Sequence, residues 1–295
     1  MARLCKASLL VFFALCAIGQ VSGPRVTVPL IAFGSHGEPT SLTVESLVIT
    51  DQKLPIAGAV LTGGADLPLE LGVLIDASKS QSSARVGEIL KALNQFVTEA
   101  IRGPEDRVFL LTFGETQKMT KWLKKDQLRS TTLDVGVGGR TALYDSLAVA
   151  CDKRLGLRDW TKPTRRVLVL VSDGLDNQSS KTLNDAILEA QKSGAVVFAI
   201  DAVKRTFPLS QLDQKMKYVQ LGYLTEPTGG KFFADVSGEE IPKAFTSVRE
   251  LMEKMSYLTY APANAWSQGV HEVLIKPVPK KKLQLSYARK YFWNP

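Results

Sequence analysis

The sequence predicts an α/β fold in which helices cover a doubly wound, mostly parallel sheet. From about Pro68 to Ser256, apolar runs of strand length alternate with stretches whose apolar residues recur every three or four positions. This alternation is typical of successive βα units. The runs are apolar almost throughout, as strands buried on both faces of a parallel sheet are. With 45% hydrophobic and 22% charged residues among 295, the chain has enough apolar side chains for such a core.

The expected elements follow one another in a regular order. In this order they are strand 69–76, helix 86–101, strand 107–114, a short edge strand at 118–123, helix 141–155, strand 165–174, helix 182–192, strand 195–203, a last strand fed by the turn in 224–235, and helix 241–255. Buried strands here end in polar residues rather than in further apolar ones. Ligand sites of open parallel sheets lie outside those strand ends.

The two flanks of this region have a different pattern. Residues 24–66 and 257–295 contain strand-like runs such as VTVPLIAF and HEVLIKPV and no helical stripe. Isolated hairpins are only marginally stable, so we expect the flanks to meet in a small β-rich domain beside the α/β domain of residues 67–256. The alternative is that they add edge strands to the main sheet.

The first 23 residues predict export. Arg3 and Lys6 precede an apolar run at 7–18, and small residues suited to cleavage follow near Gly19 and Gly23. This is the layout of a signal peptide, and the run is too short for a transmembrane helix. An N-terminal anchor that is never cut is the alternative. We therefore expect an exported chain, in a bacterial periplasm or outside the cell, with no integral membrane segment.

Cysteine and charge exclude some classes of protein. Cys5 and Cys16 leave with the leader, so no disulfide is expected, and Cys151 is predicted to be a small buried apolar residue. The net charge of +8 falls by two with the leader, because Arg3 and Lys6 are lost. This modest excess gives little reason to expect a nucleic-acid partner. We interpret the basic runs, such as 162–166, mostly as solvated turns and element ends.

Oxygen-bearing side chains stand at three ends of the predicted elements. Asp76, Ser78 and Ser80 come where the first strand ends, Asp173 where the apolar run of strand 165–174 stops, and Thr141 where a glycine-rich loop meets a helix. Two carboxylates and three hydroxyls form a hard ligand set that suits Mg²⁺, with Mn²⁺ or Ca²⁺ as alternatives, and does not suit zinc. Taken singly, each group has another explanation: Asp76, Ser78 and Thr141 as helix caps, and Asp173 as a turn residue.

Three stretches carry a family resemblance. LIDASKS, GGRTALYDS and VLVSDGLDN resemble the metal-ion-dependent adhesion site (MIDAS) of von Willebrand factor A (VWA) domains, which have a Rossmann-like fold. The flanks are similar to those of secreted bacterial VWFA-related proteins. The resemblance implies that Ser78, Ser80 and Thr141 coordinate the metal directly or nearly so. It also implies that Asp76 and Asp173 act directly or through water, and that the ion's open position binds a carboxylate of a protein partner.

Lys79 lies within the first of these motifs and Asp176 within the third. The family usually has glycine between the two serines, where this chain has Lys79. A lysine beside the ion lowers the metal affinity that we expect, or points outward and helps to bind an acidic ligand. Asp176 either supports the site from behind or forms a turn, and we favour the turn.

Three functions are open at this point. The leading hypothesis is an exported module for protein binding or cell adhesion that uses no catalysis. The second is a metal-dependent hydrolase or phosphatase with Asp76 as nucleophile, although no second carboxylate stands two residues further on and the histidines, His36 and His271, lie in the flanks. The third is a structural scaffold whose metal site is satisfied from within.

Overall fold

The computed structural model describes residues 23–114, 116–128, 135–202, 220–279 and 282–294. The predicted leader therefore lies outside the described residues, apart from Gly23. A six-stranded sheet forms the centre of the larger part, in the order β11-β10-β9-β6-β7-β8. Its strands are β6 (Leu69–Asp76), β7 (Arg107–Phe113), β8 (Lys118–Met119), β9 (Arg165–Val171), β10 (Val196–Ile200) and β11 (Phe232–Phe233). All neighbours are parallel except β7 and β8, which confirms the predicted fold class.

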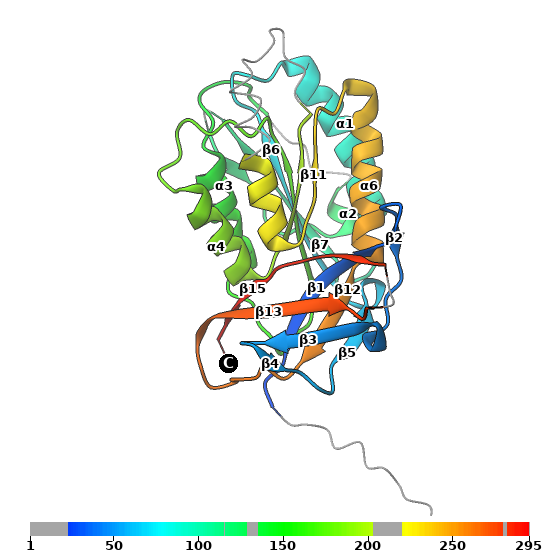
Figure 1. Ribbon diagram of the computed structural model, residues 1–295. Coiled ribbons are helices and arrows are strands. Elements are labelled where there is room, and N and C mark those ends of the chain that lie inside the picture. Colours follow the sequence, from blue (N-terminus) through cyan, green and yellow to red (C-terminus); the bar gives the residue numbers. More distant parts are fainter. Residues whose placement is uncertain (1–22, 115, 129–134, 203–219, 280–281, 295) are drawn as a thin grey trace, which may run out of the picture.

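Helices cover both faces of this sheet (Figure 1). On one face α1 (Ser83–Ala100) packs beside α6 (Ile241–Lys254), and the ring centres of Phe96 and Phe245 lie 5.1 Å apart. On the other face lie α3 (Leu143–Ala150) and α4 (Leu183–Ser193). Each pair buries its apolar stripe against the sheet, so the strands are buried on both sides, as their composition predicted.

Three local details differ from the sequence prediction. The helix expected over 141–155 is α-helical only from Leu143 to Ala150 and continues as one π-helical turn, Cys151–Leu155, closed by a bond from the Gly156 N–H to the Cys151 carbonyl. The edge strand is limited to β8, and an unpredicted short helix, α2 (Lys125–Leu128), follows it. Cys151 is buried as predicted, and burial raises the pKa of its thiol to about 12.

The flanks form two antiparallel sheets of their own, as the fold-class prediction required. One has the order β14-β1-β12-β5 with β2 paired to β1, and the other β15-β13-β3-β4. Their strands are β1 (Val26–Phe33), β2 (Pro39–Thr40), β3 (Leu47–Asp51), β4 (Leu54–Pro55), β5 (Val60–Gly63), β12 (Ser256–Tyr260), β13 (Gly269–Pro277), β14 (Gln284–Tyr287) and β15 (Lys290–Trp293). The two flanks share one apolar core. The alternative of edge strands on the main sheet is wrong, because its strands all lie between residues 69 and 233.

A buried polar cluster ties the two flanks together. The Tyr291 hydroxyl donates to Oδ2 of Asp51 at 2.5 Å, and Nδ1 of His271 lies 3.6 Å from Oδ1 of the same carboxylate. Nε2 of His271 lies 2.7 Å from the Ser267 carbonyl. Since a carbonyl only accepts, Nε2 carries a hydrogen. Asp51 belongs to the amino-terminal flank and its partners to the carboxyl-terminal one, so neither flank is complete alone.

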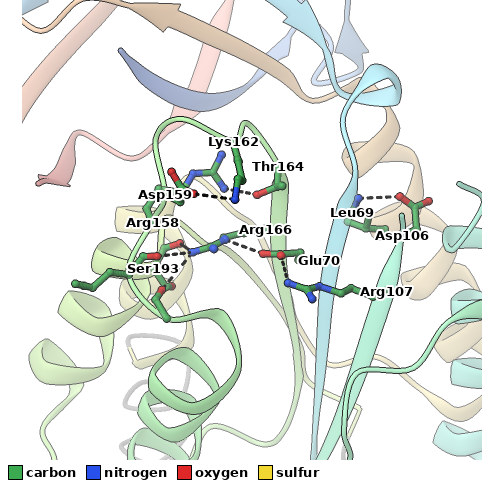
Figure 2. Close-up of polar contacts among 12 residues, drawn as sticks. Leu69, Glu70, Asp106, Arg107, Arg158, Asp159, Lys162, Thr164, Arg166 and Ser193 are labelled. Atoms are coloured by element: carbon green, nitrogen blue, oxygen red, sulfur yellow. Dashed lines mark hydrogen bonds and ion pairs between the residues drawn. The ribbon is translucent and has the colours of Figure 1, made fainter. Parts of the chain in front are cut away.

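Charged side chains are buried at the amino ends of the parallel strands, where the flank sheets adjoin the main sheet (Figures 1 and 2). Glu70 pairs with Arg107 and, at 2.8 Å, with Nε of Arg166. Nη1 of Arg166 donates to the Ser193 carbonyl. Arg165 donates to the Leu67 carbonyl at 2.8 Å. Arg165 and Arg166 begin β9, as the strand predicted from residue 165 requires. The expectation that the basic residues at 162–166 are solvated is wrong for these two, because both side chains are buried. These contacts close the sheet at the end away from the predicted site.

Candidate metal site

Asp76 is the last residue of β6 and is only 1% exposed. Its Oδ1 accepts the Ser78 N–H at 2.9 Å, and its Oδ2 accepts the Ser172 hydroxyl at 2.7 Å. Helix α1 is capped instead by Ser82, whose hydroxyl accepts the Arg85 N–H at 3.2 Å. The alternative of Asp76 or Ser78 as the cap of this helix is therefore wrong.

Ser78 and Ser80 lie next to each other, with their hydroxyl oxygens 3.1 Å apart. Ser78 is buried and Ser80 is exposed, so the pair leads from the interior to the surface. The structure thus places the first three predicted site residues together at the carboxyl end of β6, facing the end of β9.

The glycine-rich loop before α3 lies against this segment. The Gly138 N–H donates to the Ala77 carbonyl at 2.9 Å, and the Lys79 N–H donates to the Gly139 carbonyl at 3.1 Å. Gly114, after β7, lies against both: a Cβ there would be 2.8 Å from the Ala77 and Gly138 carbonyl oxygens. Only glycine fits so close to two backbone segments.

Thr141 is 4% exposed and its main chain is held by Asn177. The Thr141 N–H donates to Oδ1 of Asn177 at 2.9 Å, and the Asn177 N–H donates to the Thr141 carbonyl at 3.0 Å. Ala142, not Thr141, is the N-cap of α3 and makes no side-chain cap bond. Between the described residues no hydrogen bond of the Thr141 hydroxyl is found.

Asp173 stands two residues after the end of β9 and is 1% exposed. Its Oδ1 accepts the Leu175 N–H at 3.0 Å, and Gly174 has a φ of +76°, so the expected turn is present. Asp173 is also close enough to act electrostatically on Asp76. Burial first, and then the Asp173 charge, raise the pKa of Asp76 to about 6, against the hydrogen bonds that Asp76 accepts from Ser78 and Ser172. A cation between these carboxylates would offset both the burial of the Asp76 charge and its repulsion from Asp173.

Asp176 does more than form a turn. Its Oδ2 accepts the N–H groups of Leu143 and Tyr144, at 2.8 and 3.2 Å, and the Ser179 hydroxyl at 2.5 Å. It therefore caps α3 from another loop and fixes the helix that follows Thr141. The turn role that we favoured for Asp176 is therefore incomplete, because this side chain also binds the first amide groups of α3.

Sequence reasoning missed three supporting residues: Gly114, Ser172 and Asn177. Ser172 and Asn177 lie in the quoted stretch VLVSDGLDN, so the nearby Asp173 was the available signal. The sequence marks Gly114 only as the end of a predicted strand, because its role at the site depends on contact with loops far away along the chain.

The grouped side chains suit a hard divalent cation. They offer two carboxylates and three hydroxyls, which are oxygen ligands of the kind that Mg²⁺ and Mn²⁺ accept. Within the part of the chain that the structure describes, no three His, Cys, Asp or Glu side chains gather closely enough to hold a metal. A cation at this sheet edge would therefore depend on the hydroxyls of Ser78, Ser80 and Thr141.

A search against protein families matches the von Willebrand factor type A domain over residues 70–247. The chain belongs to the VWA domain family. This match covers most of the region between β6 and α6, including all five predicted site residues. A search of curated proteins found no match to this chain.

Solved structures with similar chains have low sequence identity. A Bacteroides fragilis aerotolerance-related membrane protein is 16% identical, with 62% of this chain and 98% of that chain covered and a TM-score of 0.41. Manganese-loaded Plasmodium vivax TRAP protein is 13% identical, with 78% and 95% covered and a TM-score of 0.44. Mussel byssus proximal thread matrix protein 1, with a zinc-occupied MIDAS motif, is 18% identical, with 68% and 49% covered and a TM-score of 0.49. This chain therefore spans about half of the mussel protein.

None of the helices in the described ranges combines the length and apolar character needed to cross a bilayer.

Proposed function

We propose that this VWA domain binds a divalent cation, preferably Mg²⁺, through Asp76, Ser78, Ser80, Thr141 and Asp173. The bound cation would then attract an acidic side chain of a protein partner to its open position. The chain is a binding or adhesion module rather than an enzyme. The observation that carries this proposal is the meeting of buried Asp76 and Asp173 with hydroxyls that cap no helix.

The charges explain why a partner's carboxylate would bind here. Two carboxylates neutralise a divalent ion when both contact it, and less completely when water separates them from it. An ion held mainly by neutral hydroxyls keeps positive charge toward its open position. Ser80, the exposed member of the set, marks the side from which a partner would approach.

The geometry favours binding over hydrolysis by Asp76. Both of its oxygens accept hydrogen bonds and the side chain is 1% exposed, whereas a nucleophile must reach its substrate. The two histidines lie in the flanks, His271 in β13 and His36 between β1 and β2, away from the end of β6. Export rests on the leader 1–23, and a periplasmic or extracellular location in a bacterium is part of the proposal.

A pull-down tests this function. The chain without residues 1–23 is immobilised and exposed to envelope and secreted proteins in Mg²⁺ or in chelator, beside Asp173→Ala and the control Asp66→Ala, whose side chain is exposed near the start of β6. We expect the original chain and Asp66→Ala to retain partners in Mg²⁺ and to lose them in chelator. Asp173→Ala should retain none of these partners in either condition. Identical recovery in chelator and with Asp173→Ala would contradict metal-dependent binding. Metal binding without any metal-dependent partner would favour the scaffold.

A further inference from the structure

Two basic residues stand beside the proposed ligands, on loops that contact each other. Lys79 lies between Ser78 and Ser80, and Arg140 directly precedes Thr141. The Lys79 N–H donates to the carbonyl of Gly139, the residue before Arg140, at 3.1 Å. Both side chains are exposed, so the rim of the site has two positive charges on adjacent loops.

The Arg140 guanidinium is partly held in place. Its Nη2 donates to the Asn177 carbonyl at 2.7 Å, and Asn177 in turn fixes the main chain of Thr141. An arginine anchored through one nitrogen loses less freedom when its other N–H groups bind a carboxylate. The anchor also keeps Arg140 close to the loop that carries Asp173.

The charges at this edge leave a positive excess once a cation is present. A divalent ion balances Asp76 and Asp173, and Lys79 and Arg140 then add two charges. Across the described part of the chain neither residue is in an ion pair, and the charged carboxylate of nearby Asp176 accepts the amide groups of α3 rather than pairing with either of them. A ligand whose single carboxylate binds the ion would leave Lys79 and Arg140 without an acidic partner.

We propose that Lys79 and Arg140 form a second acidic subsite, so that the preferred partner is a protein segment with two acidic side chains close in sequence. One carboxylate binds the metal, and the second pairs with Lys79 and Arg140. This inference rests on the proposed function of the metal site. It explains the residue with which this chain departs from the usual glycine: Lys79 contributes to ligand choice.

Selection from a random-peptide phage library tests the subsite. The original chain and the double variant Lys79→Ala/Arg140→Ala are panned in Mg²⁺ and in chelator, with Lys91→Ala as the control because Lys91 is exposed on α1. We expect Mg²⁺-dependent peptides that are enriched in two acids within about three residues of each other for the original chain and the control. The double variant should select peptides with one acid.

Fluorescence anisotropy then gives the size of the effect. The double variant should bind a selected two-acid peptide about fivefold to tenfold more weakly than the original chain does at low salt. When one acid of that peptide is changed to alanine, the difference between the two proteins should fall to less than about twofold. Mg²⁺ affinity is measured on each variant to show that the metal site is intact, with Arg140→Lys as the conservative variant. Mg²⁺-dependent selection of one-acid peptides, equal for both proteins, would overturn the subsite alone. No Mg²⁺-dependent selection by either would overturn the proposed function as well.

Discussion

The Ser172 hydroxyl donates a hydrogen bond to Oδ2 of Asp76, 2.7 Å away, across the parallel pair formed by β6 and β9. Ser172 is not a proposed ligand, but its bond sets the direction of a proposed ligand. It also accepts the Gly174 N–H at 3.1 Å, and so connects the Asp76 carboxylate to the turn that carries Asp173. The two carboxylates of the site are therefore positioned together.

Ser172→Ala should weaken Mg²⁺ binding without unfolding the protein. Groups that orient metal ligands are commonly worth about tenfold or more in affinity, and we expect a loss of about tenfold here. Isothermal titration calorimetry measures it, with Ser83→Ala as the control because Ser83 is exposed in the first turn of α1. Equal Mg²⁺ affinity for Ser172→Ala and the original chain would show that the bond does not position Asp76 for the metal.

Asp76→Asn should stabilise the metal-free protein above pH 6. Burial raises the pKa of Asp76 from 3.8 to about 6, so folding favours the protonated acid. The stability that this gives is present below pH 3.8 and is lost as the pH rises to about 6. The variant, always neutral, escapes this loss, which is about 3 kcal/mol at most.

Urea unfolding in chelator at about pH 4 and about pH 7.5 tests this. The free energy of unfolding of Asp76→Asn should exceed that of the original chain by more at the higher pH. Saturating Mg²⁺ should remove this difference, because the original chain then gains stability from the bound ion. A difference between the two proteins that does not change with pH would contradict the raised pKa.

Gly114→Ala should disturb the metal site although Gly114 offers no ligand. The new methyl group would be 2.8 Å from the Ala77 and Gly138 carbonyl oxygens, so the segment after β6 or the loop before Thr141 must move. We expect a loss of about 1–3 kcal/mol in the free energy of unfolding and weaker Mg²⁺ binding. Gly136→Ala, in the glycine-rich loop before Thr141 and with nothing within 4 Å of its Cβ, is the matched control. Similar behaviour of the two variants would contradict the close approach at Gly114.

Tyr291→Phe should destabilise the protein through its flanks. The hydroxyl of Tyr291 donates to Asp51, which is 0% exposed, and its loss leaves a buried carboxylate without that donor. We expect a decrease of about 1.5–3 kcal/mol in the free energy of unfolding, with Mg²⁺ affinity unchanged. Tyr223→Phe, at an exposed position, should have no effect. A loss of Mg²⁺ affinity as large as that of Ser172→Ala would contradict the separation of the two regions.

The sequence was informative where the local pattern decides the structure. The apolar run of β6 and the polar residues that follow it were sufficient to place Asp76, Ser78 and Ser80 at the end of a central parallel strand. The same logic placed Asp173 after β9. Strand period and composition depend on burial, and burial on both faces leaves a clear trace in the sequence.

Features that depend on contacts between distant segments could not be read this way. Arg165 and Arg166, at the start of a predicted strand, were expected to be solvated because basic residues are usually exposed. Instead, Glu70 and the Leu67 carbonyl bind them in the interior. The roles of Gly114 and Asp176 likewise arise only when loops from different strands meet. Such pairings have no periodicity along the chain.

We propose that the side chains of Asp76, Ser78, Ser80, Thr141 and Asp173 form one metal site. The most direct test is calorimetric titration of Mg²⁺ into the metal-stripped chain, beside Asp173→Ala, Thr141→Ala and the exposed control Asp66→Ala. We predict one binding event per chain for the original protein and for Asp66→Ala, and none for the other two variants. Absence of Mg²⁺ binding by the original chain, or equal binding by Asp173→Ala and Thr141→Ala, would contradict the account.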